Sequence, residues 1–381
     1  MTTLKTIRAR WAVAAVFLLH GMLMGGWVAH IPLAKERLEV GPAVFGLALL
    51  AIAAGAVFAM LFTGAAIQKY GSARVTVVTG IGFALTFLGP ITAPTYTLFC
   101  LGGFFMGMTI GSMDVAMNSH GLAVERALKL PTMSLFHGMF SLGAMAGTFI
   151  GAAVMNAVGP LPQALIFAII YLVLLIVAMS YLLPASVDKG EEGASFVLPS
   201  MATLGLGLLC FLALMIEGSI LDWGAIFLRE RFAMEAETAA LAFGVYQGGL
   251  AVARFTGDVL RLKFGAVRLV TVSAWMTAVG TAVALFAPWP ATVFVGFVIA
   301  GLGIGNIAPV LFAGGGRLEP ESPGHGIAAV TTLGYTGFLA GPPLIGFTAE
   351  VAGLQLALGL TVIAAIIIAV FARAVDAADT F

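Results

Sequence analysis

Carboxylates inside otherwise apolar stretches are the residues of this sequence best suited to chemistry. Asp114 lies in one such stretch, with Asn118 one helical turn later, and Glu217 lies in another. An ionisable side chain at the centre of a bilayer costs about 2.5–3.5 kcal/mol on insertion scales, so it needs a partner, a cavity or a function. A carboxylate partly shielded from water can bind and release protons near neutral pH. We therefore expect Asp114 and Glu217 to bind a coupling proton or a ligand, with a purely structural, hydrogen-bonded acid as the alternative.

Two histidines lie at similar depth in their own apolar stretches. His137 is expected level with Asp114, and an Asp–His contact would relay a proton because histidine titrates near neutrality. A structural hydrogen bond is the alternative role for His137. His20, in the middle of the first apolar stretch, is a weaker candidate for the same solute pathway.

Acidic and aromatic residues continue beyond Glu217 along the same stretch. Asp222 either binds a ligand or pairs with Arg229 or Arg231. Trp223 and, at a comparable depth in the first stretch, Trp27 either stack on a ring-shaped ligand or belong to the interfacial aromatic belt.

Neutral hydrogen-bonding groups form a third set, which comprises Gln247, Asn306 and Tyr335. A polyhydroxylated ligand must exchange water for equivalent partners, and such groups supply them. Hydrogen bonding between helices is the alternative. Apart from Arg254, and Arg373 at the last position of the last span, no arginine or lysine lies inside a predicted span, and Arg254 is expected near the inner end of its span. An anionic substrate would require an embedded cation, so the sequence favours a neutral or cationic solute.

The composition indicates that these apolar stretches lie in a lipid bilayer. Hydrophobic residues make up 61% of the 381 positions and charged residues 9%, whereas soluble domains average about 25% charged residues. Formal net charge is zero, so nothing indicates a nucleic-acid partner. Cys100 and Cys210 both lie in apolar runs and are interpreted as small apolar residues. No nucleophile, metal or phosphate-binding motif is found, so we expect neither an enzyme nor a cofactor.

Polar residues divide the chain into apolar segments long enough to span a bilayer as helices. We predict an all-α integral membrane protein with twelve transmembrane helices, in an N-terminal six-helix bundle (1–184), a cytoplasmic linker (185–199) and a C-terminal six-helix bundle (200–381). The predicted spans are 11–31, 43–67, 75–93, 96–122, 132–157, 163–184, 200–227, 238–257, 269–287, 291–313, 324–349 and 354–373.

The distribution of basic residues predicts the orientation. With a cytoplasmic N-terminus, fourteen of the eighteen lysines and arginines fall on the inner side, as the positive-inside rule requires. Both termini are therefore expected in the cytoplasm of a multi-pass protein of the inner (plasma) membrane.

The two halves repeat one another at an offset of 194 residues. Gly71 and Arg74 after the second helix match Gly265 and Arg268 after the eighth, and glycines of helices 4 and 5 match glycines of helices 10 and 11. Because six helices separate the copies, both have the same orientation, which makes this a parallel repeat.

On these residues the chain resembles the major facilitator superfamily. The segment from Gly64 to Arg74 is similar to that family's signature loop, although Gln68 stands where an acid is usual, and the second copy keeps an acid, Asp258. The resemblance implies a cytoplasmic latch between the halves. Its residues here would be Gly71, Arg74, Arg254, Asp258, Gly265 and Arg268.

Longer strings resemble one branch, the YbjJ and MosC-type membrane proteins. They include MDVAMNSHGLAVE (113–125) and IEGSILDWGAIFLRE (216–230). The MosC type is associated with an inositol amine, and the branch is distantly similar to proton-coupled fucose permeases. The resemblance implies a sugar, polyol or inositol-amine-like substrate.

Together these features predict a proton-coupled secondary transporter that works by rocker-switch alternating access. Its expected partners are a small-molecule substrate, protons or another coupling ion, and membrane lipid, and the chain is expected to act as a monomer. A proton-driven multidrug or metabolite exporter is the alternative. A membrane sensor and an intramembrane hydrolase fit less well, since the chain carries neither a soluble signalling domain nor a nucleophile–base motif.

Overall fold

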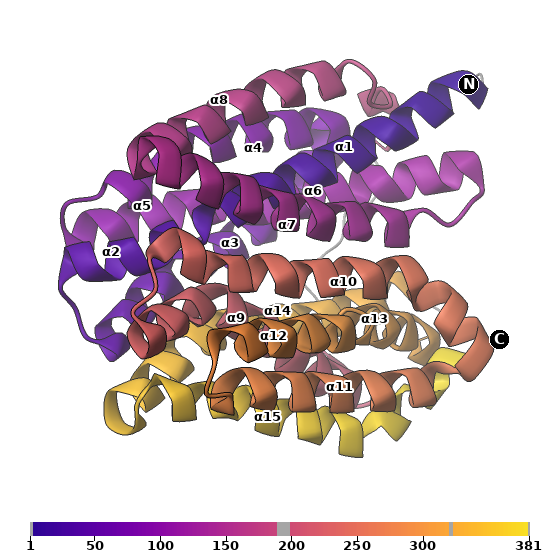
Figure 1. The fold of residues 1–381 in the computed structure, drawn as a ribbon. Coiled ribbons are helices and arrows are strands. Elements are labelled where there is room, and N and C mark those ends of the chain that lie inside the picture. The colour runs from indigo at the N-terminus through magenta and orange to yellow at the C-terminus, as the bar shows by residue number, and fades with distance from the viewer. Residues whose placement is uncertain (1–2, 189–198, 320–322, 380–381) are drawn as a thin grey trace. The chain divides into compact units, whose positions relative to one another are not determined.

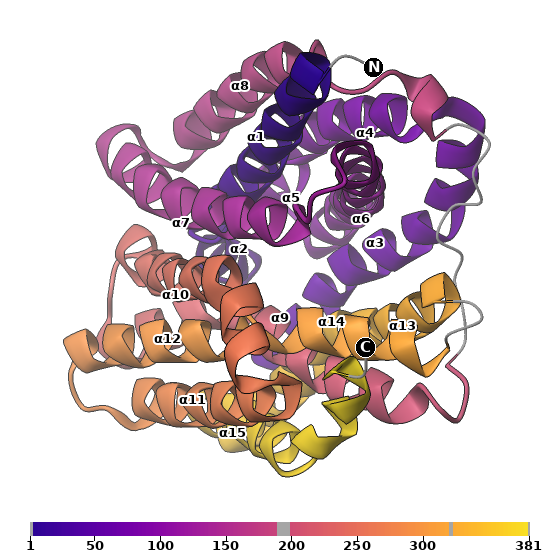
Figure 2. The ribbon, with the colours of Figure 1, turned by 90° about the vertical axis from the view of Figure 1, so that its right-hand side faces the viewer.

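Helices account for nearly all of the computed structural model, which describes residues 3–188, 199–319 and 323–379 (Figures 1 and 2). No strand occurs among these residues, as the sequence predicts. Residues 189–198 of the predicted linker lie outside the described part of the chain. The α-helices are α1 (Thr3–Trp27), α2 (His30–Leu38), α3 (Pro42–Tyr70), α4 (Ser72–Thr86), α5 (Leu88–Thr92), α6 (Tyr96–Leu128), α7 (Met133–Val158), α8 (Pro160–Met179), α9 (Leu204–Phe232), α10 (Ala236–Phe264), α11 (Ala266–Phe286), α12 (Pro290–Ile304), α13 (Ile307–Leu318), α14 (Pro323–Ala352) and α15 (Leu354–Val370).

Each predicted span coincides with one of these helices or with a consecutive pair. Nine helical segments of the described residues are long and apolar enough to cross a membrane, or ten if α15 and the bent helix after it count as one span. α10 and α14 are not among them, because polar side chains and glycines lower their hydropathy. Twelve crossings therefore stay a prediction.

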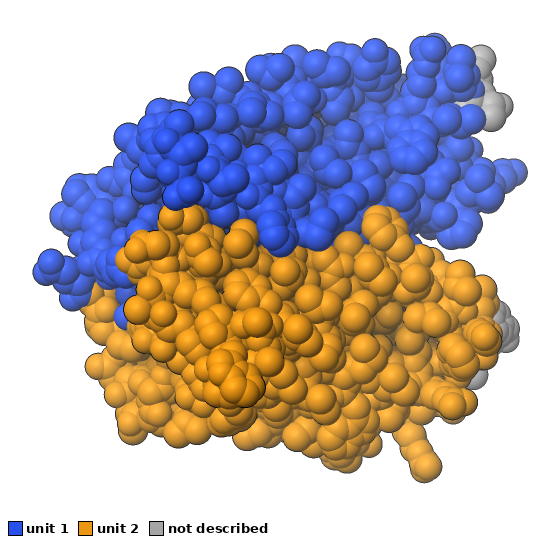
Figure 3. Space-filling view, viewed as in Figure 1, with its two compact units in different colours: residues 1–39, 51–193 blue, residues 40–50, 194–381 orange. Residues whose placement is uncertain are grey.

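The chain forms two compact units (Figure 3). The first comprises Met1–Glu39 and Ala51–Gly193, and the second comprises Val40–Leu50 and Ala194–Phe381. The beginning of α3 thus belongs to the second unit, where Glu350 of α14 accepts a hydrogen bond from the backbone N–H of Ala43 at 3.1 Å.

Glycines allow the helices of each unit to pack closely. In the first unit, Gly107 of α6 lies against the backbone of α3 at Ile52. In the second unit, Gly301 of α12 lies against the backbone of α10 at Tyr246. Both pairs differ by the offset of 194 residues that the sequence predicts, so the repeat extends to the helix contacts themselves.

Two glycines form the same sharp turn in each unit. Gly71 has φ 81° between α3 and α4, and Gly265 has φ 79° between α10 and α11. Only glycine adopts this region without strain, which explains why both copies of the predicted signature loop carry one.

The second unit departs from the predicted helix ends in two places. α10 continues to Phe264, so Arg254 lies almost three turns before the end of the helix. From the sequence, Arg254 was expected near that end. A turn at Gly305 and Asn306 separates α12 from α13, so the predicted span 291–313 consists of two helices.

Candidate functional sites

A buried ion pair joins α9 to α10 inside the second unit. Arg254 Nη2 lies 3.6 Å from Glu217 Oε2, and the side chains of Arg254 and Glu217 are only 12% and 13% exposed. In such surroundings each charge needs the other, because an unpaired buried charge is strongly unfavourable. Glu217 is therefore not an isolated acid, and Arg254, expected in the cytoplasmic latch, lies with it.

Further polar groups surround this ion pair. The hydroxyl of Tyr246 interacts electrostatically with both Glu217 and Arg254, and it is buried without a hydrogen-bond partner. Gln247, the next residue, is also buried, and its Oε1 has no partner either. Asn306, in the turn before α13, lies with its Oδ1 against Gly257, one turn beyond Arg254. Three of the predicted site residues, Glu217, Gln247 and Asn306, thus lie on helices that meet in this part of the second unit.

The C-terminal half of α9 carries a separate polar set. Ser219 and Trp223 are fully buried, and among the residues that the structure describes neither Ser219 Oγ nor Trp223 Nε1 has a hydrogen-bond partner. The indole of Trp223 packs edge-on against Phe45, with 6.1 Å between ring centroids. Asp222 makes no hydrogen bond or ion pair with any residue that the structure describes.

The arginines considered as partners of Asp222 are engaged elsewhere. Arg229 donates to the carbonyl of Met234 and lies 3.6 Å from Glu235. Arg231 donates to the carbonyls of Leu285 and Ala287. The alternative interpretation of Asp222 as half of a surface ion pair with either arginine is therefore wrong.

Asp114 and Asn118 lie together in the first unit, as their spacing predicts. Asn118 Nδ2 donates to the backbone carbonyl of Asp114 at 2.8 Å and to Asp114 Oδ1 at 3.1 Å. Both side chains are half-buried. The amide thus fixes the orientation of the carboxylate in the middle of α6.

The predicted histidines lie between α1 and α7 in the same unit. The ring of His137 is edge-on to Phe17 at 5.5 Å, and that of His20 contacts Phe140 at 5.7 Å. His20 is buried, and its Nδ1 has no hydrogen-bond partner. A proton relay between His137 and Asp114 stays a prediction.

The remaining predicted residues have other neighbours. Trp27 is buried and stacks on His30 at 6.3 Å, and Tyr335 lies 6.3 Å from Phe338 on α14. Of the expected latch residues, Arg74, Asp258 and Arg268 are exposed. Arg268 also covers the ring of Phe264, at 5.6 Å. A latch role for these three residues stays a prediction.

Two buried hydrogen-bonded histidines were missed by the sequence analysis. His120 Nε2 accepts from the backbone N–H of Leu183 at 3.1 Å, so the proton resides on Nδ1, which lies 2.7 Å from Ser72 Oγ. His30 pairs with Gln163 at 2.7 Å between Nε2 and Oε1. Each partner comes from a distant helix or loop, so spacing along the chain gave no signal for either.

Near the end of each unit, an aspartate accepts a hydrogen bond from the backbone in the first turn of a helix. Asp188 accepts from the backbone N–H of Ser72 at 3.2 Å, at the start of α4. Asp379 accepts from the backbone N–H of Ala266 at the start of α11, and it lies 3.6 Å from Arg261. α4 and α11 are equivalent in the repeat, so the two aspartates serve equivalent helix ends.

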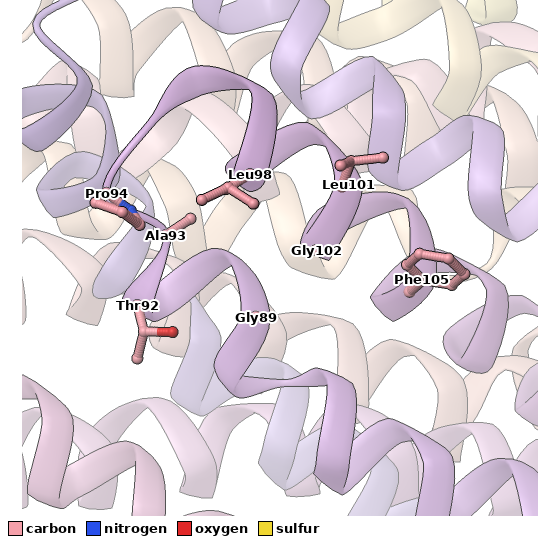
Figure 4. A pocket seen from close by; sticks show the side chains of 8 residues that line it. All are labelled: Gly89, Thr92, Ala93, Pro94, Leu98, Leu101, Gly102 and Phe105. Atoms are coloured by element: carbon pink, nitrogen blue, oxygen red, sulfur yellow. The ribbon is translucent and has the colours of Figure 1, made fainter.

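A hollow of about 300 Å³ lies beside α5 and the first turns of α6 (Figure 4). Its wall is almost entirely apolar, and Leu98, Leu101 and Phe105 are exposed. It holds none of the predicted site residues, and its chemistry suits an apolar chain better than a polar solute. The lining residues are Gly89, Thr92, Ala93, Pro94, Leu98, Leu101, Gly102 and Phe105.

Long apolar helices that bury a few ionised and amide groups in each unit define a polytopic membrane transporter. The family model described as Major Facilitator Superfamily matches residues 12–261, and the chain belongs to this superfamily. It is accordingly a multi-pass membrane protein and not an enzyme.

Relatives place the chain in the branch that its sequence resembles. An MFS-type transporter of Yersinia pestis is 31% identical over 360 residues, which cover 94% of each protein. The transporter y4wD of Sinorhizobium fredii is 30% identical over 371 residues, covering 94% of this chain and 96% of y4wD. The membrane protein MosC of Rhizobium meliloti is 28% identical over 362 residues, covering 94% of this chain and 88% of MosC. The predicted MosC-like branch is confirmed.

Solved structures share the fold at low sequence identity. The nucleoside transporter NupG matches with a TM-score of 0.74 and 14% identity, covering 96% of this chain and 98% of NupG. The human organic anion transporter MFSD10 matches with a TM-score of 0.68 and 16% identity, covering 98% of this chain and all of MFSD10. At this identity the likeness concerns the fold alone.

Proposed function

We propose that this chain is a proton-coupled secondary transporter of a small neutral or cationic polar solute, such as a sugar, polyol or inositol amine. It would act in the inner (plasma) membrane by rocker-switch alternating access. Membership of the superfamily supports transport, and the buried groups described above support the choice of coupling ion and solute.

The observation that carries the proposal is the ion pair of Glu217 and Arg254. When Glu217 takes up a proton, it loses its charge and its attraction for Arg254 weakens. The released groups, together with the unpaired Tyr246 hydroxyl and the Gln247 amide, then have hydrogen-bonding capacity for a hydroxylated solute. Because a buried group without a partner is unfavourable, loss of the proton favours the pair and release of the solute.

Asp114 gives the first unit its own candidate for protonation. Asn118 already donates to one carboxylate oxygen, so the acid is held in one orientation, in which it can take up a proton. Neutralising Asp114 would remove the penalty of carrying a charge through the unloaded return step.

Proton movement in proteoliposomes tests this function. A pH-sensitive dye is trapped inside, and sugars, inositols and amino sugars are added outside one at a time. We expect at least one solute to acidify the lumen with the wild-type protein but not with Glu217→Gln or Asp114→Asn. Glu230→Gln, which removes an exposed acid from the same helix as Glu217, should behave like the wild type. Wild-type acidification in both site variants would overturn the proton-coupling role.

A further inference from the structure

The C-terminal half of α9 carries an acid that forms no ion pair within the described part of the chain. Asp222 lies three residues after Ser219 and directly before Trp223, so the three side chains share about a third of the helix circumference. Ser219 Oγ and Trp223 Nε1 are buried without partners, and both nearby arginines bind other groups. A carboxylate among apolar helices is unfavourable unless something positive accompanies it. This set is separate from the ion pair of Glu217 and Arg254.

The neighbouring helix presents an unpaired oxygen to the same part of α9. α14 carries Pro342 and Pro343 inside the helix. Proline has no N–H, so the carbonyls four residues earlier, those of Phe338 and Leu339, lack their helical donors. Leu339 lies about 200° around α14 from Gly341, which faces α9, so only the Phe338 carbonyl is available on the side of α9.

The packing of α9 on α14 brings the Phe338 carbonyl near the level of the acid. Gly218 lies against Phe338, and the next turn of α14, at Gly341, lies against Ser219, with 3.5 Å between Ser219 Oγ and an ideal Cβ at Gly341. The two helices therefore run parallel, and the same register places Asp222 level with the two prolines. Side chains on a helix lean toward its N-terminus, which directs Asp222 back toward the level of the Phe338 carbonyl.

We propose that the Asp222 carboxylate, Ser219 Oγ and the carbonyl of Phe338 form a binding site for one small cation. Oxygen ligands with a single negative charge suit either a protonated amine group or Na⁺. If the amine belongs to the solute, the site narrows the proposed substrate class to cationic hydroxylated compounds. If the ligand is Na⁺, it adds a second coupling ion. The site's role in transport rests on the proposed function, but cation binding itself does not.

Cation binding by the purified full-length protein in detergent tests the site without any transport. Thermal unfolding is followed while NaCl or ethanolamine hydrochloride replaces tetraethylammonium chloride at constant ionic strength. Tetraethylammonium is the reference cation because it is too bulky for a gap between packed helices. Ethylene glycol serves as the uncharged match for ethanolamine. A ligand that binds the folded state raises the melting temperature in a saturable way, and we expect this for Na⁺ or ethanolamine.

Three variants locate the effect. Asp222→Asn should weaken cation binding by about tenfold or more, because it removes the ionised partner of charge-assisted interactions. Pro342→Ala restores an N–H for the Phe338 carbonyl, so it should weaken binding by a smaller factor while the helix remains intact. Glu230→Gln should leave the affinity unchanged.

The outcomes separate the two sources and the two proposals. A sodium effect lost in Asp222→Asn identifies Na⁺, and an ethanolamine effect lost in that variant identifies an amine. If neither cation stabilises the wild type, or if Asp222→Asn and Pro342→Ala keep wild-type affinity, the site does not exist. If a cation raises the melting temperature but the protein moves no protons in the liposome assay, the cation site is supported and the proposed proton coupling is rejected.

Discussion

The guanidinium of Arg254 and the carboxylate of Glu217 form a cross-helix ion pair, with 3.6 Å between Nη2 and Oε2. The two residues are 37 positions apart in the sequence, on helices that run side by side in the second unit. The pair makes the stability of this unit depend on both charges being present or both being absent.

Removing one partner of this pair should therefore destabilise the protein more than removing both. Arg254→Met leaves Glu217 buried and unpaired, and we expect a loss of about 3 kcal/mol in unfolding free energy. The double variant Arg254→Met/Glu217→Leu should recover most of that loss, since apolar groups replace both charges. Chemical unfolding of the wild type, Arg254→Met, Glu217→Leu and the double variant in the same detergent gives the coupling energy between the two side chains. Additive effects of the two single substitutions would show that the pair contributes nothing.

Asp188 and Asp379 should stabilise the equivalent helices α4 and α11 by different amounts. Asp188→Ala removes the acceptor for the Ser72 N–H, and the loss of such a cap costs about 1 kcal/mol. Asp379→Ala removes the corresponding acceptor for Ala266 and also the ion pair with Arg261, so a slightly larger loss is expected. Hydrogen exchange at the first turns of α4 and α11 locates each effect. Equal protection of both turns in wild type and variants would contradict the capping role.

Glycines at the helix contacts should tolerate no methyl group. A Cβ at Gly301 would clash with the backbone carbonyl of Tyr246, and one at Gly107 with that of Ile52. We expect Gly301→Ala and Gly107→Ala each to lower the unfolding free energy by about 1–3 kcal/mol, because overpacking forces backbones apart. Gly359 of α15 has no atom within 4 Å of its would-be Cβ, so Gly359→Ala is the matched control. That control should be neutral or slightly stabilising, by up to about 1 kcal/mol. Unfolding curves of the three variants and the wild type test this, and equal stability of all four would contradict the close packing.

The repeat is the part of the fold that the sequence predicts most fully. Gly71 and Gly265 stand 194 residues apart, and their φ angles of 81° and 79° agree. The type of residue dictates this conformation, so the sequence alone sufficed. Helix ends were predicted less well: the predicted span 238–257 stopped before Asp258, although α10 continues to Phe264.

The pairing of buried groups was beyond the sequence for a physical reason. Hydropathy gives the depth of a residue such as Glu217 but not the direction in which it points around the helix axis. The i, i+4 pair of Asp114 and Asn118 was predicted because both lie on one helix, where spacing fixes direction. His120 and Ser72 meet only through the packing of α6 on α4, which no local pattern records.

The predicted orientation can be tested at two exposed positions of the first unit. Thr92 ends α5, and Leu130 follows α6. If the positive-inside rule holds, Thr92 faces the outside and Leu130 the cytoplasm. Single cysteines at these positions, in a Cys100→Ala/Cys210→Ala background, should react differently with an impermeant maleimide in intact spheroplasts. Thr92→Cys should be labelled at once and Leu130→Cys only after permeabilisation. The reverse pattern would invert the topology and place the helix ends held by Asp188 and Asp379 outside the cell.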